Sequence, residues 1–189
     1  MLELSSLGAK VLQIRSVEFA SKYEMPIRVL SSFSSTGGTL ITNEESGLES
    51  AVISGITCTD DDSKLILRNV PDTPGIAAKI LSPISEAGID IDVIVQNVGS
   101  DKLTDFTFTV KNEHSDKAAK ILNDLVKTLG GGEIEFVKDI SKVSVVGVGM
   151  KSHAGVAARM FKALAEKQIN IDMISTSEIK ISVVVSNCL

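Results

Sequence analysis

The sequence predicts an α+β protein made of two βαββαβ modules, the first of which is inserted into the second. Three observations lead to this prediction. A segment of 24 residues recurs after 80 positions, helical periodicity alternates with strand periodicity in both copies, and turn-forming residues separate the periodic runs. The second copy also lacks the second helix and the fourth strand of the first copy. A strand ahead of the first copy is not needed to complete that copy.

The repeat aligns residues 74–97 with 154–177 without a gap, and eight of the 24 positions are identical. Gly75 and Gly155 head the aligned helices, and Asp92 and Asp172 occupy the same position in the strands that follow. Because the match continues through a glycine turn, a helix and a strand, we expect two copies of one supersecondary unit.

The first copy should span residues 63–140. It opens with the apolar run Leu65–Leu67, which ends in five consecutive turn formers at 71–75. Apolar residues with the spacing of one helical face follow from Ile76 onwards. Pro83 should kink or shorten this helix, and Gly88 suits its C′ position.

The rest of the first copy alternates in the same way. Strands are predicted at 89–95 and 106–110, where apolar and polar residues alternate. A helix at 115–128 ends at the three glycines 130–132, and a last strand covers 134–137.

The second copy repeats the first half of this pattern. It has strands at 143–148, 169–174 and 179–185 and a helix at 155–167, but neither a second helix nor a fourth strand. Residues 52–57 form an unassigned strand, which we expect to be the missing edge. The second module is therefore 49–62 plus 141–189, C-terminally incomplete. With its second helix absent, we expect the face around Val183 and Val185 to be exposed.

Residues 1–48 match neither copy. A helix at 16–22 and short strands at 27–30 and 38–41 are too few elements to bury a core alone. This segment is predicted to be the end of a larger domain.

Composition excludes several classes of function. The net charge is −5 and no basic run carries interleaved aromatics, which argues against nucleic-acid binding. No apolar stretch approaches the roughly 20 residues that span a bilayer. Cys58 and Cys188 are expected as free thiols, so the protein is predicted to be cytoplasmic, with no membrane partner.

Catalytic motifs are few. His114 and His153 are far apart and lack metal-ligand partners at helical spacing, so no metal site is predicted. Residues 147–152 carry glycines before a Lys-Ser pair, but Met150 breaks the spacing that a phosphate loop requires.

One possible ligand site remains, at the turn into the helix that begins at Ile76. Unpaired N–H groups at a helix start favour a carboxylate, Asp72 can pair with an ammonium group, and the Gln96 amide can donate and accept hydrogen bonds. Together they describe a site for an α-amino acid. In the alternative interpretation, Asp72 only caps the helix and Gln96 is a surface strand residue.

These residues carry a resemblance to a known family. The stretches 70–77, 90–97, 142–153 and 174–179 resemble the tandem ferredoxin-like ACT domains of bacterial aspartate kinases. Segments of residues 7–41 resemble the end of the amino-acid-kinase catalytic domain. The resemblance implies a regulatory (β) subunit or C-terminal regulatory region, which confers feedback inhibition by threonine and/or lysine on aspartate phosphorylation.

The resemblance also implies residue roles. Asp72 would face the ammonium group of threonine, the backbone of Gly75, Ile76 and Ala77 its carboxylate, and Gln96 its hydroxyl. Backbone at Asn170 and Ile171 of the partner subunit would close the site in a homodimer. Five further residues match positions tied to the lysine response or to contact with the catalytic subunit: Met150, Ser152, Thr176, Ser177 and Glu178.

Two departures from the family pattern favour one type of amino-acid site, in the first module. Ala157 stands where some relatives have Thr, and the turn at 151–155 lacks the P-D-x-P-G pattern. ATP and magnesium would serve the parent kinase, with no catalytic residue and no cofactor in this chain, which should be inactive alone. The competing hypothesis is an ACT-type dimerisation clamp that binds no effector. An intact enzyme is disfavoured, because no catalytic carboxylate cluster is visible.

Overall fold

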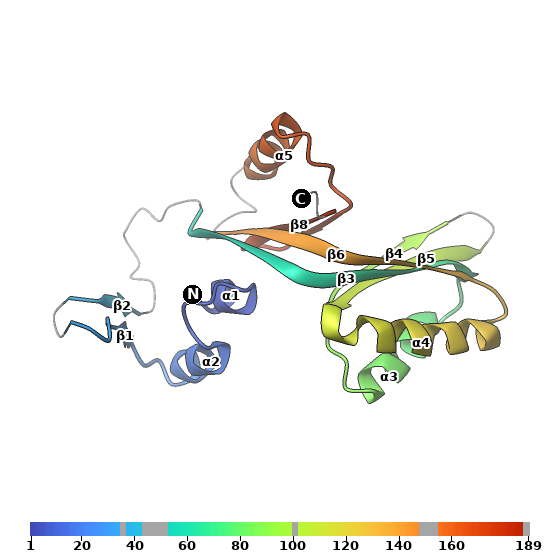
Figure 1. The fold of residues 1–189 in the computed structure, drawn as a ribbon, viewed down its shortest axis with the longest axis horizontal. Helices are drawn as coiled ribbons and strands as arrows, with labels where there is room; N and C mark the ends of the chain where they lie inside the picture. Colours follow the sequence, from blue (N-terminus) through green and yellow to red (C-terminus); the bar gives the residue numbers. More distant parts are fainter. Residues whose placement is uncertain (35–36, 43–52, 100–101, 148–154, 187–189) are drawn as a thin grey trace. The chain divides into compact units, whose positions relative to one another are not determined.

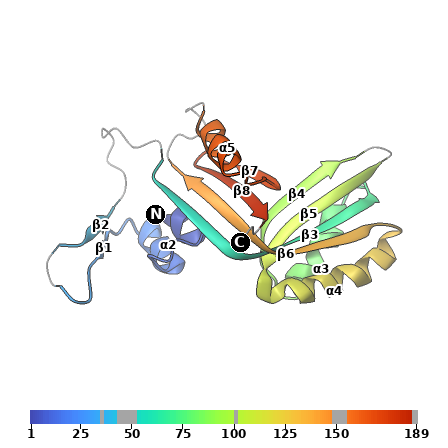
Figure 2. The same cartoon turned by 45° about the horizontal axis from the view of Figure 1, so that its top comes forward.

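The computed structural model describes residues 1–34, 37–42, 53–99, 102–147 and 155–186 (Figures 1 and 2). The helices are α1 (Leu2–Ser6), α2 (Ile14–Lys22), α3 (Ile76–Glu86), α4 (Asn112–Leu129) and α5 (Val156–Glu166). The strands are β1 (Ile27–Val29), β2 (Thr39–Ile41), β3 (Gly55–Pro71), β4 (Ile91–Val98), β5 (Leu103–Lys111), β6 (Glu133–Val146), β7 (Met173–Thr176) and β8 (Lys180–Ser186). β1 pairs with β2, and the other six strands form one sheet in the order β4-β5-β3-β6-β8-β7. This element content confirms the predicted α+β class.

β3 and β6 are each longer than the sequence predicted. The strands expected at 52–57 and 65–67 are joined in β3, and those at 134–137 and 143–148 are joined in β6, as far as the described residues extend. The residues between the predicted strands are mostly polar but include neither glycine nor proline, so nothing in them breaks an extended chain. Each strand instead contains one residue with positive φ, Asn69 at 56° and Asp139 at 55°. The pairing register of β3 with β5 shifts beside Asn69, as at a β-bulge.

The chain divides into two compact units. The first unit is Asp60–Lys142, to which Val184–Leu189 is assigned, and the second unit is Met1–Thr59 with Val143–Val183. In the second unit the Ser54 N–H donates to the Val146 carbonyl at 2.7 Å, at the point where β3 begins and β6 ends. The predicted domain boundaries, 1–48, 63–140 and 49–62 plus 141–189, stay a prediction.

In the first unit α3 and α4 lie on the same face of the sheet (Figures 1 and 2). Their apolar stripes cover a core of large side chains from β3 and β5. The fully buried members include Leu65, Leu67, Phe106, Phe108, Ile80, Ile84 and Leu122. Burial of this aliphatic and aromatic surface is the main stabilising term of the unit.

Pro83 does not shorten α3, contrary to that part of the prediction. The helix continues to Glu86, and the Ala87 N–H donates to the Pro83 carbonyl at 3.2 Å. Ile80 and Ile84 are fully buried on either side of the proline, so packing holds the last turn although one backbone hydrogen bond is missing. Gly88 follows with φ 72°, the left-handed conformation predicted for it.

In the second unit α5 covers one face of the strands, and α1 lies on the other side of them (Figure 1). α5 packs on Val145, Val156 and Ile181. α1 approaches β3 so closely that a Cβ on Gly55 would lie 2.8 Å from Leu4. The strand expected at 169–174 begins only at Met173, after the Ile169 N–H donates to the Leu164 carbonyl at the end of α5.

The expected exposure around Val183 and Val185 was also wrong. Their exposed fractions are 0% and 6%. Exposed apolar side chains of the same face lie instead at and just before the start of β3, where Ile53 is 39% and Ile56 is 64% exposed. A helix joining the third strand of such a module to its fourth would lie over the first and fourth strands. The described residues of this unit include no helix there, so residues 53–56 are uncovered while β8 is covered.

Candidate functional site

The turn between β3 and α3 is held by backbone hydrogen bonds at both ends. The Asp72 N–H donates to the Lys102 carbonyl at 2.8 Å, and the Ile76 N–H donates to the Thr73 carbonyl at 3.0 Å. Just ahead of the turn, the Asn69 N–H donates to the Asp105 carboxylate at 2.9 Å. These bonds place Asp72 at the mouth of the turn with its side chain exposed.

α3 begins at a glycine that no other residue would replace without strain. Gly75 is the N-cap with φ 90° and ψ 0°, a left-handed conformation that costs other residues about 1–2 kcal/mol. Among the described residues no side chain caps this helix, and a Cβ at Gly75 would meet no heavy atom within 4 Å. The Ile76 N–H is bonded to Thr73, whereas the N–H groups of Ala77 and Ala78 precede the first bond from one turn of the helix to the next, from Lys79 to Gly75. Such N–H groups at a helix start favour an anion.

Gln96 completes the arrangement from β4. It is exposed and lies opposite Phe106 of β5 in the sheet. A depression of about 400 Å³ brings it together with the turn; the lining residues are Asp72, Thr73, Pro74, Gly75, Ile76, Ala77 and Gln96. All five first-module residues of the predicted effector site thus lie around one hollow. It offers a carboxylate, open N–H groups and an amide, which are complementary to the ammonium, carboxylate and side chain of an amino acid.

The other predicted residues belong to the second unit. Asn170 is exposed and Ile171 half-buried, both in the segment between α5 and β7. Thr176 ends β7, and Ser177 and Glu178 form the turn into β8, where the Ser177 N–H donates to the Lys180 carbonyl at 2.8 Å. Met150 and Ser152 lie outside the described residues.

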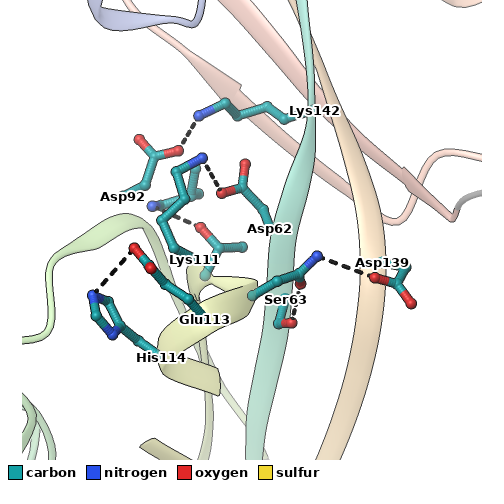
Figure 3. Close-up of polar contacts among 11 residues, drawn as sticks. Asp62, Ser63, Asp92, Lys111, Glu113, His114, Asp139 and Lys142 are labelled. Carbon is teal, nitrogen blue, oxygen red and sulfur yellow. Dashed lines mark hydrogen bonds and ion pairs between the residues drawn. The ribbon is translucent and has the colours of Figure 1, made fainter. Parts of the chain in front are cut away.

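A polar cluster at one end of the first unit was missed by sequence reasoning (Figure 3). The Asp62 side chain is 3% exposed and pairs with Lys111 at 2.8 Å, and the Lys142 side chain is 7% exposed and pairs with Asp92. Asn112 accepts a hydrogen bond from Ser63 and donates one to Asp139. The signal that could have revealed it is a Ser-Lys pair at 63–64 and again at 141–142, each directly before an apolar run.

Thr73 and Pro74 line the depression and were not singled out from the sequence, nor was the Lys102 carbonyl that anchors Asp72. The Lys102 anchor depends on a long-range contact that no local pattern reports. Nearby, Arg68 pairs with Glu135 at 2.6 Å and with Asp105 at 3.4 Å. The hydrogen bond and charge of Glu135, with the lesser effect of Asp105, raise the pKa of the Arg68 guanidinium above its ordinary value.

The described residues also bear on metal binding and on membrane insertion. No group of three His, Cys, Asp or Glu side chains there could hold a metal ion. None of the helices in the described ranges is long and apolar enough to cross a membrane.

Comparison with known proteins identifies the family to which this architecture belongs. Residues 65–130 and residues 143–188 each match the ACT domain family. Aspartate kinase of Pseudomonas fluorescens is 60% identical over 186 residues, which are 98% of this chain and 45% of that protein. The chain therefore spans less than half the length of this relative.

Comparison with solved structures leads to the same family. The regulatory subunit of aspartate kinase from Thermus thermophilus superposes with a TM-score of 0.68 at 39% identity, over 72% of this chain and 89% of that one. Aspartate kinase from Synechocystis has a TM-score of 0.71 at 36% identity, over 98% of this chain and 34% of that one. The fold and the two family matches define a protein of tandem ACT domains. Within that class, the chain belongs to the aspartate kinase family, of which it is the regulatory ACT part.

Proposed function

We propose that the chain senses threonine at the depression beside α3 and thereby confers feedback inhibition on the phosphorylation of aspartate. The observation that supports this most is the meeting of Asp72, the uncapped start of α3 and Gln96 around one hollow. An α-amino acid needs these three partners, whereas a pure dimerisation clamp needs none of them.

In this proposal each group recognises one part of threonine. Asp72 pairs with the ammonium group, the backbone at Gly75, Ile76 and Ala77 binds the carboxylate, and Gln96 hydrogen-bonds the hydroxyl. Backbone at Asn170 and Ile171 of the partner subunit closes the site when two chains form a homodimer. The hollow is open in a single chain, which is consistent with a second chain supplying its remaining wall.

We further propose that Thr176, Ser177 and Glu178, with Met150 and Ser152, form a lysine-responsive site or the contact with the catalytic part of the kinase. A solved structure of aspartokinase α and β subunits, 42% identical to this chain, supports a regulatory chain that works together with a catalytic one. In this proposal ATP and magnesium act in that catalytic part, in the cytoplasm, and are not bound by the regulatory chain.

A ligand series tests the proposal. Threonine should raise the melting temperature, since a ligand at a hundredfold excess over its Kd stabilises the folded state by about 2.7 kcal/mol. Valine has the same shape without the hydroxyl, and threoninamide lacks the carboxylate charge, so both should shift the melting temperature less. Lysine is tested in parallel for the second site. If none of the twenty amino acids raises the melting temperature, the chain is a clamp without an effector.

A further inference from the structure

β4 contains a β-bulge just ahead of the part that lines the depression beside α3. Residues 91–94 of β4 lie opposite residues 108–110 of β5, four residues against three. Asp92 and Val93 therefore share the single partner Thr109. Side chains alternate between the two faces of a strand, so one extra residue moves every following side chain to the other face of the sheet.

The bulge decides which residue of β4 faces the start of α3. After the bulge, Gln96 lies opposite Phe106 of β5. Phe106 is 1% exposed and belongs to the core of the first unit, so Gln96 is on the helix-covered face, where it lines the depression. Without the extra residue, Val95 would lie opposite Phe106 instead, and Gln96 would turn to the other face. A valine in that place could not form a hydrogen bond with a ligand.

The apolar pattern of β4 favours the register without a bulge. Ile89, Ile91, Val93 and Val95 recur at every second position, and a regular strand would turn all four towards the core. The observed register therefore needs other interactions to hold it, and these must act at residues 92 and 93.

Two interactions hold the bulge in place. The Val93 N–H donates to the Thr109 hydroxyl at 3.1 Å, which gives a partner to a backbone group of the bulge. Thr109 is 2% exposed, so packing fixes this hydroxyl. Asp92 pairs with Lys142 of β6, whose side chain is 7% exposed (Figure 3). A buried ammonium group needs an opposite charge, so Lys142 fixes the position of Asp92.

We infer that Thr109 and the pair of Asp92 with Lys142 are positioning residues for amino-acid recognition, because they hold the bulge that turns Gln96 towards the ligand. None of these three residues lines the depression. Their role rests on the proposed recognition of threonine, which it deepens by naming what sets the discrimination for a hydroxyl group.

The test measures the Kd of threonine and the Kd of valine by calorimetry, in the wild-type chain and in Thr109→Val. The substitution keeps a similar shape but removes the hydroxyl that accepts from Val93. The ratio of the valine Kd to the threonine Kd reports recognition of the ligand's hydroxyl, and it should fall roughly threefold to tenfold, the equivalent of one hydrogen bond. In a Gln96→Ala chain, where the reader of the hydroxyl is already lost, Thr109→Val should not change this ratio further.

Lys142→Met tests the second interaction. It keeps the aliphatic part of the side chain and removes the partner of Asp92, so the ratio should fall in the same direction. The fall should be smaller than in Thr109→Val, because the Asp92 side chain is 45% exposed and water can solvate it when the pair is broken.

Thr104→Val is the matched control. Thr104 is also a buried threonine of β5, 1% exposed, and its hydroxyl donates to the Asn97 carbonyl of β4 at 2.9 Å, beyond the bulge. Its loss should destabilise the sheet but leave the ratio of the two Kd values unchanged. An equal fall of the ratio in Thr104→Val and Thr109→Val would overturn the inference, because general loosening of β4 would then explain both.

A measurement without ligand separates this inference from the proposed function. In the wild type, NMR should show backbone NOEs between Gln96 and Phe106, and in Thr109→Val these should weaken while NOEs between Val95 and Phe106 arise. If the wild type binds no amino acid, the proposed function fails, and the change of register alone decides whether Thr109 positions Gln96. If threonine binds but Thr109→Val keeps the wild-type ratio and NOEs, Thr109 is not a positioning residue, while the proposed function stands.

Discussion

The starts of α3 and α5 have nearly the same backbone but different surroundings. Gly75 has φ 90° and ψ 0°, Gly155 has φ 99° and ψ −7°, and each is an N-cap without a side-chain cap among the described residues. The repeat aligns Asp72 with Ser152 and Gln96 with Thr176. Only the first copy therefore pairs the open helix start with a carboxylate and an amide. The fold supplies an anion-favouring helix start twice, and the side chains of the turn and the neighbouring strand decide what it recognises.

The two units also differ in the size of their apolar cores. In the first unit two helices cover the sheet, and twelve buried apolar residues form one cluster. In the second unit the cluster beneath α5 has three buried members, with Ala157, Met160 and Phe161 packed around them. In the described residues α5 alone covers this face of the second unit, so the two units should differ measurably in stability.

The largest expected effect comes from removing a buried leucine of the first unit, compared with a leucine of the second unit. Leu122→Ala removes a fully buried side chain of α4 and should cost about 2–5 kcal/mol of the free energy of unfolding. Leu164→Ala removes a half-buried leucine of α5 that lines an open hollow together with Ile53 and Ile56, and it should cost about 1 kcal/mol, since the remaining cavity is open to water. Hydrogen exchange of peptides from each unit, in increasing urea, reports the two losses separately. Equal losses would mean that this hollow is covered in solution.

A binding measurement sharpens the comparison of the two helix starts. Asp72→Asn keeps the shape of the side chain but removes its charge, so the affinity for threonine should fall by about 1.5–3 kcal/mol. That is roughly a tenfold to hundredfold rise in Kd, measurable by calorimetry at fixed salt. Asp124→Asn, in an exposed aspartate of α4, is the control and should leave the Kd unchanged. If the Asp72→Asn chain binds as tightly as the wild type, Asp72 is not the ammonium partner.

A pair of glycine substitutions tests whether the two helix starts differ in function alone. Gly75→Ala and Gly155→Ala should each cost about 1–2 kcal/mol, since both glycines have φ near +90° and an added Cβ meets no described atom within 4 Å. Stability should therefore fall equally in the two variants, as thermal unfolding without ligand would show. Only Gly75→Ala should also weaken threonine binding. Equal loss of binding in both would place an effector at α5 as well.

Much of the fold could be predicted from the sequence because the repeat and the periodic apolar residues are local signals. Helices α3, α4 and α5 and the turn glycines Gly75, Gly88 and Gly130 all fell where those signals placed them. The continuity of β3 and β6 could not be predicted, because some of the polar residues between the predicted strands, such as Asp62 and Lys142, are buried by contacts distant in sequence. Lys142, for example, pairs with Asp92, 50 residues away.

The candidate site shows the same limit. Asp72, Gly75 and Gln96 could be named from residue type and position, and the structure brings them to one hollow. The hydrogen bond from Asp72 to Lys102 could not be predicted, because it depends on how the β4–β5 loop returns to the turn. For a related reason, the exposed face of the second unit was predicted at β8, whereas the structure exposes Ile53 and Ile56 near the start of β3. The repeat predicts one helix between residues 141 and 189, and only the topology shows which strands that helix covers and which it leaves exposed.

The smallest expected effect concerns the surface of α4, the helix that only the first unit has. Lys127 donates a hydrogen bond to Asp124 at 2.9 Å, and this bond and the charge of Lys127 lower the pKa of the Asp124 carboxyl. A lowered pKa means that the pair stabilises the fold above the ordinary pKa of aspartate and that this contribution is lost as the pH falls through the lowered value. Lys127→Met should return the pKa of Asp124 towards its ordinary value in a carbon NMR titration. Because both side chains are about two-thirds exposed or more, at 67% and 73%, the melting temperature at neutral pH should hardly change. A loss as large as that of Leu122→Ala would show that the stability of the first unit depends on the outer face of α4 rather than on its buried stripe.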